Sequence, residues 1–178
     1  MFNAKLACAA ESTLVVIDMQ ERLAAAMAAR DEIIRATGIL LEAAGRLDVP
    51  VVVTEQYPKG LGATIAQVAS KLPAACTRVE KTCFSGSRML TLTRPQVVLA
   101  GMEAHVCVLQ TALDLAADGR EVFIAADAVC SRTEANRANA LARMERAGIV
   151  ITNSESIVFE WLRDAAHEQF RAISRLIR

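Results

Sequence analysis

Three ionisable side chains in this sequence follow predicted strands, and together they could carry out nucleophilic chemistry. Asp18 follows the apolar run Leu14–Ile17, while Lys81 and Cys107 follow two later strand predictions. A carboxylate can accept a thiol proton, an ammonium group can stabilise the thiolate, and the thiolate can attack an electrophilic carbon. In a parallel sheet the carboxyl ends of all strands lie at one edge, so the three groups can converge although they are distant in sequence.

The candidate nucleophile lies in the stretch Gln96–Leu115. An apolar run, Val97–Ala100, indicates a buried strand, Gly101 interrupts it, and apolar residues then recur at helical spacing. This pattern predicts a strand, a tight turn and a helix with Cys107 in its first turn. Unpaired N–H groups at a helix start favour negative charge, as would Lys81, so we expect the pKa of the thiol to lie below the free value of about 8.5.

Each of the three residues also has an ordinary structural interpretation. Cys107 could be a small buried core thiol, Asp18 could cap the helix that follows it, and Lys81 could be a solvated surface lysine. From their residue types alone these alternatives stay open.

The elements that must position these groups alternate between strands and helices along the chain. Besides the two apolar runs above, strands are predicted over Val51–Val53, Arg78–Glu80, Glu121–Ala126 and Ile149–Thr152. Helices are predicted over Met19–Ala29, Glu32–Leu47, Thr64–Ser70, Ser87–Leu92, Glu134–Ala147 and Glu155–Arg178. The Pro and Gly residues of Tyr57–Gly62 exclude regular structure there, and Ala128–Thr133 is expected to be irregular. The alternation predicts an α/β fold with a parallel sheet covered by helices on both faces.

Composition limits the class of protein. The chain has 178 residues, 53% of them hydrophobic, and a formal net charge of +0, which fits one domain over residues 1–178 and favours neither nucleic acid nor a membrane as partner. Its five cysteines are an odd number without paired spacing, which indicates free thiols in a reducing compartment. Met1–Glu11 lacks the apolar segment of a secretion signal, so we expect a cytoplasmic protein.

Three stretches of the chain resemble the signature motifs of one enzyme family. Leu14–Gln20, Glu80–Ser85 and Gly101–Val108 look like the motifs of the isochorismatase-like cysteine hydrolases, and the similarity includes Thr54–Leu61 and Ala126–Arg132. Within that family the chain most resembles the isochorismatase domain-containing branch.

The resemblance implies a fold and a set of roles. The implied fold is three-layered and Rossmann-like, with a six-stranded parallel sheet. The implied catalytic residues are Asp18, Lys81 and Cys107. The family's cis peptide would join Met102 to Glu103, and the backbone N–H groups of Glu103 and Cys107 would form an oxyanion hole.

Two departures from the family's patterns narrow the expected reaction. True isochorismatases lack the nucleophilic cysteine, which is present here as Cys107. Nicotinamidases of the family carry an aspartate and histidines as metal ligands after the second strand, whereas Thr54–Lys59 contains no histidine. The only histidines, His105 and His167, are not at ligand spacing. We therefore expect neither a metal nor another cofactor.

The expected function is metal-independent hydrolysis of a small amide or related acyl compound through a covalent Cys107 intermediate. Gln20, Tyr57, Phe84 and His105 are the candidate substrate-binding residues. Two alternatives remain: a thiol redox or detoxifying protein using Cys107 with a second thiol such as Cys83, and an oligomeric interaction protein with a vestigial site.

A homo-oligomer is also predicted from the end of the chain. Apolar residues recur at helical spacing there in two stripes, which could exceed what the chain's own core needs. The stripes are Ile157, Val158, Trp161, Leu162 and Ala165, then Phe170, Ile173 and Ile177.

Overall fold

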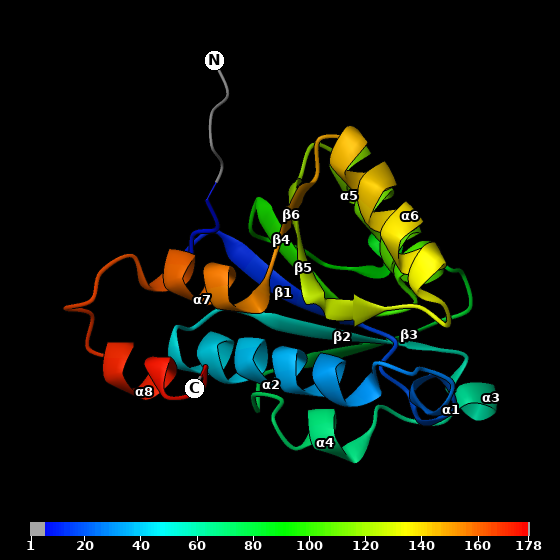
Figure 1. Cartoon of the computed structure of the whole chain (residues 1–178), viewed down its shortest axis with the longest axis horizontal. Helices are drawn as coiled ribbons and strands as arrows, with labels where there is room; N and C mark the ends of the chain where they lie inside the picture. The colour runs from blue at the N-terminus through cyan, green and yellow to red at the C-terminus, as the bar shows by residue number, and fades with distance from the viewer. Residues whose placement is uncertain (1–5, 178) are drawn as a thin grey trace.

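A six-stranded sheet forms the centre of the molecule in the computed structural model, which describes residues 6–177 (Figure 1). All neighbouring strands are parallel, in the order β3-β2-β1-β4-β5-β6. The strands are β1 (Ser12–Ile17), β2 (Val51–Gln56), β3 (Thr77–Lys81), β4 (Gln96–Met102), β5 (Glu121–Cys130) and β6 (Val150–Thr152). The predicted domain limits, Met1 and Arg178, lie outside the described residues, as do the first five residues of Met1–Glu11.

Helices cover both faces of this sheet, which confirms the predicted three-layer α/β fold (Figure 1). One face carries α2 (Arg30–Arg46) and α7 (Ser154–Leu162), and the other carries α5 (Leu109–Ala117) and α6 (Glu134–Arg146). Shorter helices connect these layers: α1 (Glu21–Ala25), α3 (Pro58–Leu61), α4 (Ala66–Ala69) and α8 (Phe170–Ser174).

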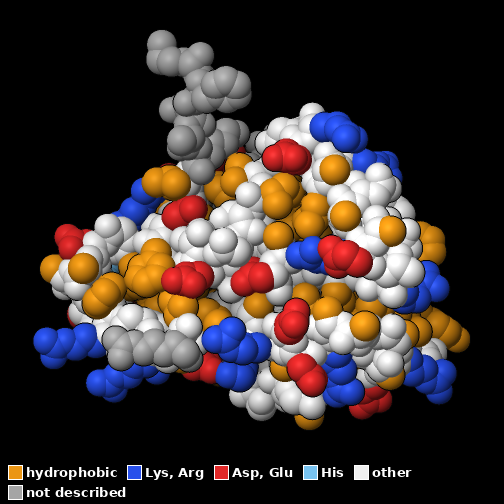
Figure 2. Space-filling view, in the orientation of Figure 1, with side chains coloured by type: hydrophobic (Ala, Val, Ile, Leu, Met, Phe, Trp, Pro, Cys, Tyr) orange, Lys and Arg blue, Asp and Glu red, His pale blue; other side chains and the backbone are white. Residues whose placement is uncertain are grey.

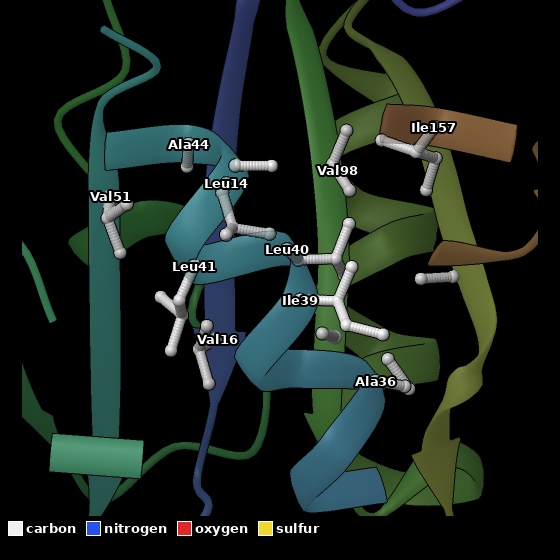
Figure 3. Close-up of a cluster of buried hydrophobic side chains, with 14 of the residues drawn as sticks. Leu14, Val16, Ala36, Ile39, Leu40, Leu41, Ala44, Val51, Val98 and Ile157 are labelled. Carbon is white, nitrogen blue, oxygen red and sulfur yellow. The ribbon is translucent and has the colours of Figure 1, made fainter. Parts of the chain in front are cut away.

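The first core layer lies between the sheet and helix α2. Figure 3 shows Leu14 and Val16 of β1 and Val98 of β4 facing Leu40 of α2, with Ile157 of α7 beside them. All five side chains are fully buried. Since every residue of β1 and β4 is buried, these central strands contain near-continuous apolar runs rather than an alternating pattern.

The opposite layer uses the alternate residues of the same strands. Val15 and Ile17 of β1 pack with Leu99 of β4 against α5 and α6. The two layers fix β1 and β4 from both sides, so the residues that follow these strands begin from a rigid edge.

Strand β5 is longer than the sequence predicted. It continues past Ala126 to Cys130, whereas irregular structure was expected from Ala128, so that expectation is wrong for its first three residues. The β4–β5 register shifts between Leu99 and Gly101, and pairing then resumes with Gly101 opposite Val129 and Met102 opposite Cys130. A bulge of this kind allows a strand to continue after an exposed interruption.

Two predictions near the ligand edge are also corrected. Tyr57–Gly62 was expected to lack regular structure, but Pro58–Leu61 forms one helical turn, because a proline fits the first helical position, where no N–H is needed. The helix predicted over Met19–Ala29 is limited to Glu21–Ala25.

The C-terminal region is not one long helix. Helix α7 ends at Leu162, the backbone of Arg163 is left-handed with φ of 61°, and only Phe170–Ser174 is helical after it. Most of the first apolar stripe and Ile173 are buried in the chain's own core. The first stripe therefore belongs mostly to the chain's own core, although Phe159 of α7 is 41% exposed.

The surface in Figure 2 carries basic and acidic side chains interspersed, with no large area of one sign on that face. No helix within residues 6–177 is long and apolar enough to cross a membrane.

Candidate active site at the carboxyl edge of the sheet

The strand order brings the three predicted groups to one edge of the sheet. Asp18 directly follows β1, Lys81 is the last residue of β3, and Cys107 lies in the turn after β4. Strand β1 has β4 on one side and β2, followed by β3, on the other. The carboxyl ends of these parallel strands therefore converge on Asp18.

Asp18 and Lys81 form a buried ion pair. Lys81 Nζ lies 2.7 Å from Asp18 Oδ2, and both side chains have 0% exposure. The other carboxylate oxygen, Oδ1, accepts a hydrogen bond of 2.7 Å from the Thr54 hydroxyl. A buried ion pair needs such additional hydrogen bonds to offset its desolvation. The alternative of a solvated Lys81 is excluded, and the residue before α1 is Gln20 rather than Asp18, so Asp18 is not its cap.

Further oxygen atoms surround the ammonium group of Lys81. It donates 2.7 Å to Gln56 Oε1 and is within 3.3 Å of the carbonyl of Cys83 and 3.2 Å of that of Phe84. An ammonium group has three protons, so these acceptors and Asp18 share them. The arrangement fixes a positive charge beside the end of β1.

Cys107 is 94% buried at the centre of this cluster, with 6% exposure. Burial raises the pKa of its thiol to about 12; the Asp18 carboxylate raises the pKa further, and the Lys81 ammonium lowers it. Asp18 and Lys81 therefore act on this thiol in opposite directions. The expectation of a pKa below the free value is wrong, because desolvation of the thiolate outweighs the attraction of Lys81.

The backbone before Cys107 departs from a simple turn and helix. The Met102–Glu103 peptide is cis, at the position implied by the resemblance. Ala104–Val108 then forms a π-helical turn that leads into α5, so Cys107 lies in this turn rather than in the first turn of an α-helix. Such turns are rare and are frequent at functional sites.

Two backbone features define the entrance to this turn. The carbonyl of Glu103 accepts hydrogen bonds from the N–H groups of Val106 and Val108 at 3.1 and 3.2 Å. Gly101 has φ of 119°, and a Cβ there would lie 2.0 Å from the carbonyl oxygen of Ile17. Only glycine therefore allows β4 to approach β1 at this point.

The four predicted substrate-binding residues lie in different environments. Gln20 is fully buried and its amide is used by backbone groups: Nε2 donates to the carbonyls of Gln56 and Gly62, and Oε1 accepts from the Gln56 N–H. This geometry favours a positioning role for Gln20. Tyr57 and Phe84 are each 55% exposed.

Tyr57 also lines a cavity of about 330 Å³ together with Lys81, Cys83 and Met89. The fourth candidate, His105, has Nδ1 at 2.9 Å from Ser131 Oγ and Nε2 at 3.4 Å from Asn136 Nδ2. Its ring therefore points toward the segment that follows β5.

Sequence reasoning missed three polar residues that support the cluster: Thr54, Gln56 and Thr111. Thr54 and Gln56 are the polar end of β2, and the same strand-end position that singled out Asp18 could have identified them. Thr111 is a fully buried threonine in an apolar helix, and nothing in the sequence pattern around it indicates a role in the site.

No group of three or more His, Cys, Asp or Glu side chains within residues 6–177 could hold a metal ion. In the stretch where nicotinamidases carry metal ligands, Glu55 instead accepts hydrogen bonds from the N–H and hydroxyl of Thr64 at 2.8 and 2.6 Å. Independence from metal stays a prediction.

A second buried thiol, Cys130, lies at the end of β5, opposite Met102. Burial raises its pKa to about 12; Glu103 raises the pKa further and Arg137 lowers it. Cys130 lines a cavity of about 510 Å³ between the start of α2 and the start of α6.

Comparison with known proteins shows similarity over nearly the whole chain. Residues 12–156 match the family described as Isochorismatase domain. The chain is 39% identical over 173 residues to isochorismatase domain-containing protein 2 of Pongo abelii, covering 94% of this chain and 83% of that relative. It is 40% identical over 177 residues to a secreted isochorismatase effector of Phytophthora sojae, covering 94% and 84%.

A solved structure called MAR1 ribonuclease, from Caenorhabditis elegans, has the same fold. It superposes with a TM-score of 0.92 at 37% identity, covering 97% of this chain and 92% of that one.

Proposed function

This chain belongs to the isochorismatase family, and from that premise we propose that it is a metal-independent cysteine hydrolase of small amides or related acyl compounds. The observation that carries the proposal is the buried Cys107 thiol, whose pKa is shifted by both members of the Asp18–Lys81 ion pair. Nucleophile, proton acceptor and counter-charge are thus present within one cluster.

The first step begins with a neutral thiol, because the pKa of Cys107 is about 12. When a substrate carbonyl binds, the Asp18 carboxylate takes the thiol proton and the sulfur attacks the carbonyl carbon. Lys81 stays protonated and stabilises the thiolate while Asp18 is neutral. The transfer moves a negative charge from Asp18 to the sulfur, within reach of the same ammonium group.

The tetrahedral intermediate places a negative charge on the former carbonyl oxygen. We assign its stabilisation to the backbone N–H groups of Glu103, which precedes the π-helical turn Ala104–Val108, and of Cys107 within that turn. The C–N bond then breaks, the leaving amine takes the proton from Asp18, and a Cys107 thioester remains.

Hydrolysis of the thioester reverses these roles. Asp18 removes a proton from a water molecule, the resulting hydroxide attacks the thioester carbonyl, and the C–S bond breaks. The sulfur regains the proton from Asp18, so the acid product leaves and the resting charges are restored.

Substrate recognition is assigned to the exposed side chains around the cluster. Tyr57 and Phe84 are accessible enough to contact a small substrate, and His105 lies two residues from the nucleophile. Gln20 would act indirectly, by holding the end of β2 against Gly62. Which small amide fits depends on these loops.

Assembly and location are further proposals. The predicted homo-oligomer is supported by exposed apolar side chains at the site's edge, Tyr57, Phe84 and Met89, and by Phe159 of the C-terminal helix α7. A cytoplasmic location stays a prediction, and one relative is called a secreted effector.

Three alternatives compete with amide hydrolysis. One is a thiol redox protein that pairs Cys107 with a second thiol such as Cys83, another is an interaction protein with a vestigial site, and the third is the ribonuclease activity in the name of the similar structure. The buried charge cluster favours hydrolysis over the first two, and a formal net charge of +0 gives no support to a nucleic-acid substrate.

The test is a screen of small amides, ureides and esters, followed by intact-mass and peptide-mass analysis. We expect turnover of at least one compound and an acyl adduct on Cys107, both absent in Cys107→Ala. An intramolecular disulfide without an adduct would favour the redox alternative. Hydrolysis that persists in folded Cys107→Ala would contradict the proposal.

A further inference from the structure

We propose that Thr111 of helix α5 is a positioning residue that sets the distance between the nucleophile Cys107 and the ammonium group of Lys81. The inference rests on the proposed function, because it concerns the same site. It assigns a role to a hydroxyl group that touches none of the reacting atoms.

Thr111 connects the two halves of the site directly. Its hydroxyl donates a 2.7 Å hydrogen bond to the carbonyl of Cys107 and accepts a 2.9 Å hydrogen bond from the N–H of Gly86. The residue has 0% exposure, so neither bond competes with bulk water. One side chain thus joins the nucleophile's turn to the segment that follows β3.

That segment is in turn bound to Lys81. The carbonyls of Cys83 and Phe84 accept from its ammonium group. Gly86 lies against its stem, since a Cβ on Gly86 would be 3.7 and 3.8 Å from Cδ and Cε of Lys81. Fixing Gly86 therefore fixes the carbonyl groups and the surface along which the lysine extends.

A second contact lies one turn further along α5. Asp114 Oδ2 accepts hydrogen bonds from the hydroxyls of Ser85 at 2.6 Å and Ser87 at 3.4 Å. Asp114 is exposed, so these bonds are weakened by solvent in a way that the Thr111 bonds are not. Helix α5 thus holds the 83–87 segment at two points, of which Thr111 is the buried one.

The separation matters because two charged groups act on the thiol in opposite directions. Asp18, at the end of β1, disfavours the thiolate, and Lys81, at the end of β3, favours it. Asp18 is attached to the rigid central strand, whereas two of the four oxygen atoms around the Lys81 ammonium group belong to the segment that Thr111 holds. A loss of the Thr111 bonds would therefore weaken the favourable effect more than the unfavourable one.

The experiment compares Thr111→Val, which keeps the shape and removes the hydroxyl, with Thr111→Ser, which keeps the hydroxyl. The matched control is Thr37→Val on α2, because Thr37 is equally buried and its hydroxyl has no partner in the described chain. The rate at which iodoacetamide alkylates Cys107 is followed against pH by peptide mass analysis, which separates Cys107 from the other cysteines.

We expect Thr111→Val to shift the alkylation profile of Cys107 to higher pH and to lower kcat by roughly 10- to 100-fold with a smaller change in KM, because misplacement by about 1 Å can cost up to about 10²-fold. Thr111→Ser should restore both values most of the way, and Thr37→Val should match the wild type. A folded Thr111→Val protein with wild-type alkylation and kcat would overturn the inference.

Two further points ensure that a folding defect, or a failure of the proposed function, is not mistaken for a failure of this inference. If Thr111→Val does not fold, Thr111→Ala removes the same hydroxyl with a smaller side chain, and it should shift the Cys107 profile in the same direction; an unchanged profile in folded Thr111→Ala would then overturn the inference. The alkylation profile does not depend on hydrolysis. Activity that persists in Cys107→Ala therefore contradicts the proposed function alone.

Discussion

The two buried thiols of this protein, Cys107 and Cys130, look alike by the criteria usually applied to reactive cysteines. Both lie at the carboxyl edge of the sheet, near the ends of the paired strands β4 and β5. Both are at least 94% buried, and burial raises the pKa of each to about 12. Each is also influenced by one carboxylate and one cation.

The difference lies in how those charges are paired. The Asp18 and Lys81 that act on Cys107 are paired with each other. Near Cys130, Glu103 is paired with Arg132, and Arg137 is bound to Glu134 and to the carbonyls of Val129 and Ala126.

A proton moved from Cys107 to Asp18 therefore stays within one neutral cluster, whereas a proton moved from Cys130 to Glu103 would leave Arg132 without its counter-charge. A perturbed pKa alone is thus a poor marker of a nucleophile, and the pairing of its neighbours is a better one.

The largest expected effect comes from removing each thiol in turn. Cys107→Ala should lower hydrolysis by at least about 10³-fold, since loss of a nucleophile removes the covalent route. Cys130→Ala should keep activity within a few-fold and cost about 1 kcal/mol of stability from lost packing. Steady-state kinetics and thermal unfolding of both variants measure this, and equal losses of activity would remove the distinction between the two thiols.

Removing the cation beside each thiol, Lys81 or Arg137, should produce a smaller difference in activity than removing the thiols. Lys81→Met should lower kcat by about 10²- to 10³-fold and raise the pKa of Cys107, because the group that lowers it is gone. Arg137→Met should instead reduce the free energy of unfolding by about 1.5–3 kcal/mol, through its lost charged hydrogen bonds, and leave kcat within a few-fold. Denaturant titration and kinetics distinguish the two, and a wild-type alkylation profile in Lys81→Met would show that Lys81 does not act on the nucleophile.

A smaller effect is expected in the pH dependence of the rate at which Cys107 is alkylated. With a pKa of about 12, the alkylation rate of wild-type Cys107 should keep rising from pH 9 toward pH 12 instead of levelling near the free value of about 8.5. Asp18 raises this pKa, so Asp18→Asn should move the curve to lower pH and speed alkylation at pH 8, yet abolish hydrolysis because the proton acceptor is lost. Glutathione under the same conditions is the reference thiol. Slower alkylation in Asp18→Asn would reverse the assigned sign.

The smallest expected effect is that of a chelator, which should change nothing. If the ion pair alone distinguishes Cys107 from Cys130, millimolar EDTA leaves kcat and KM unchanged. Loss of activity that zinc restores would mean that a metal, rather than the pairing of charges, makes the difference. Metal analysis of the purified protein is the accompanying control.

The sequence predicts most of the site because its main residues stand at strand ends. Central strands that are buried on both faces appear in the sequence as continuous apolar runs. The polar residue that follows such a run, Asp18, must lie at the carboxyl edge of the sheet, where ligands bind. Lys81 is the last residue of a strand with mostly exposed residues, so the sequence indicated its strand-end position only weakly, and the resemblance was needed to prefer a catalytic role over a solvated lysine.

The features that the sequence did not predict depend on contacts between distant segments. The extension of β5 to Cys130 requires pairing with β4. Helix α7 ends after Leu162 because Arg163 has a left-handed backbone, and no Gly or Pro at this position indicates the break in the sequence. The pKa of Cys107 was predicted in the wrong direction because desolvation is a property of the folded environment, whereas the helix start and the lysine are visible in the sequence.

The burial of Cys107 also has a consequence for chains that are not yet folded. The Asp18–Lys81 contact closes a loop of 63 residues, and contacts of such separation form late, because the entropy of loop closure must first be overcome. Before that point Cys107 is an ordinary solvated thiol with a pKa of about 8.5, and therefore more readily oxidised or alkylated at neutral pH than in the native state. Folding thus shields the sulfur from indiscriminate electrophiles, and a nascent or heat-unfolded chain is the form in which this residue is most vulnerable to chemical damage.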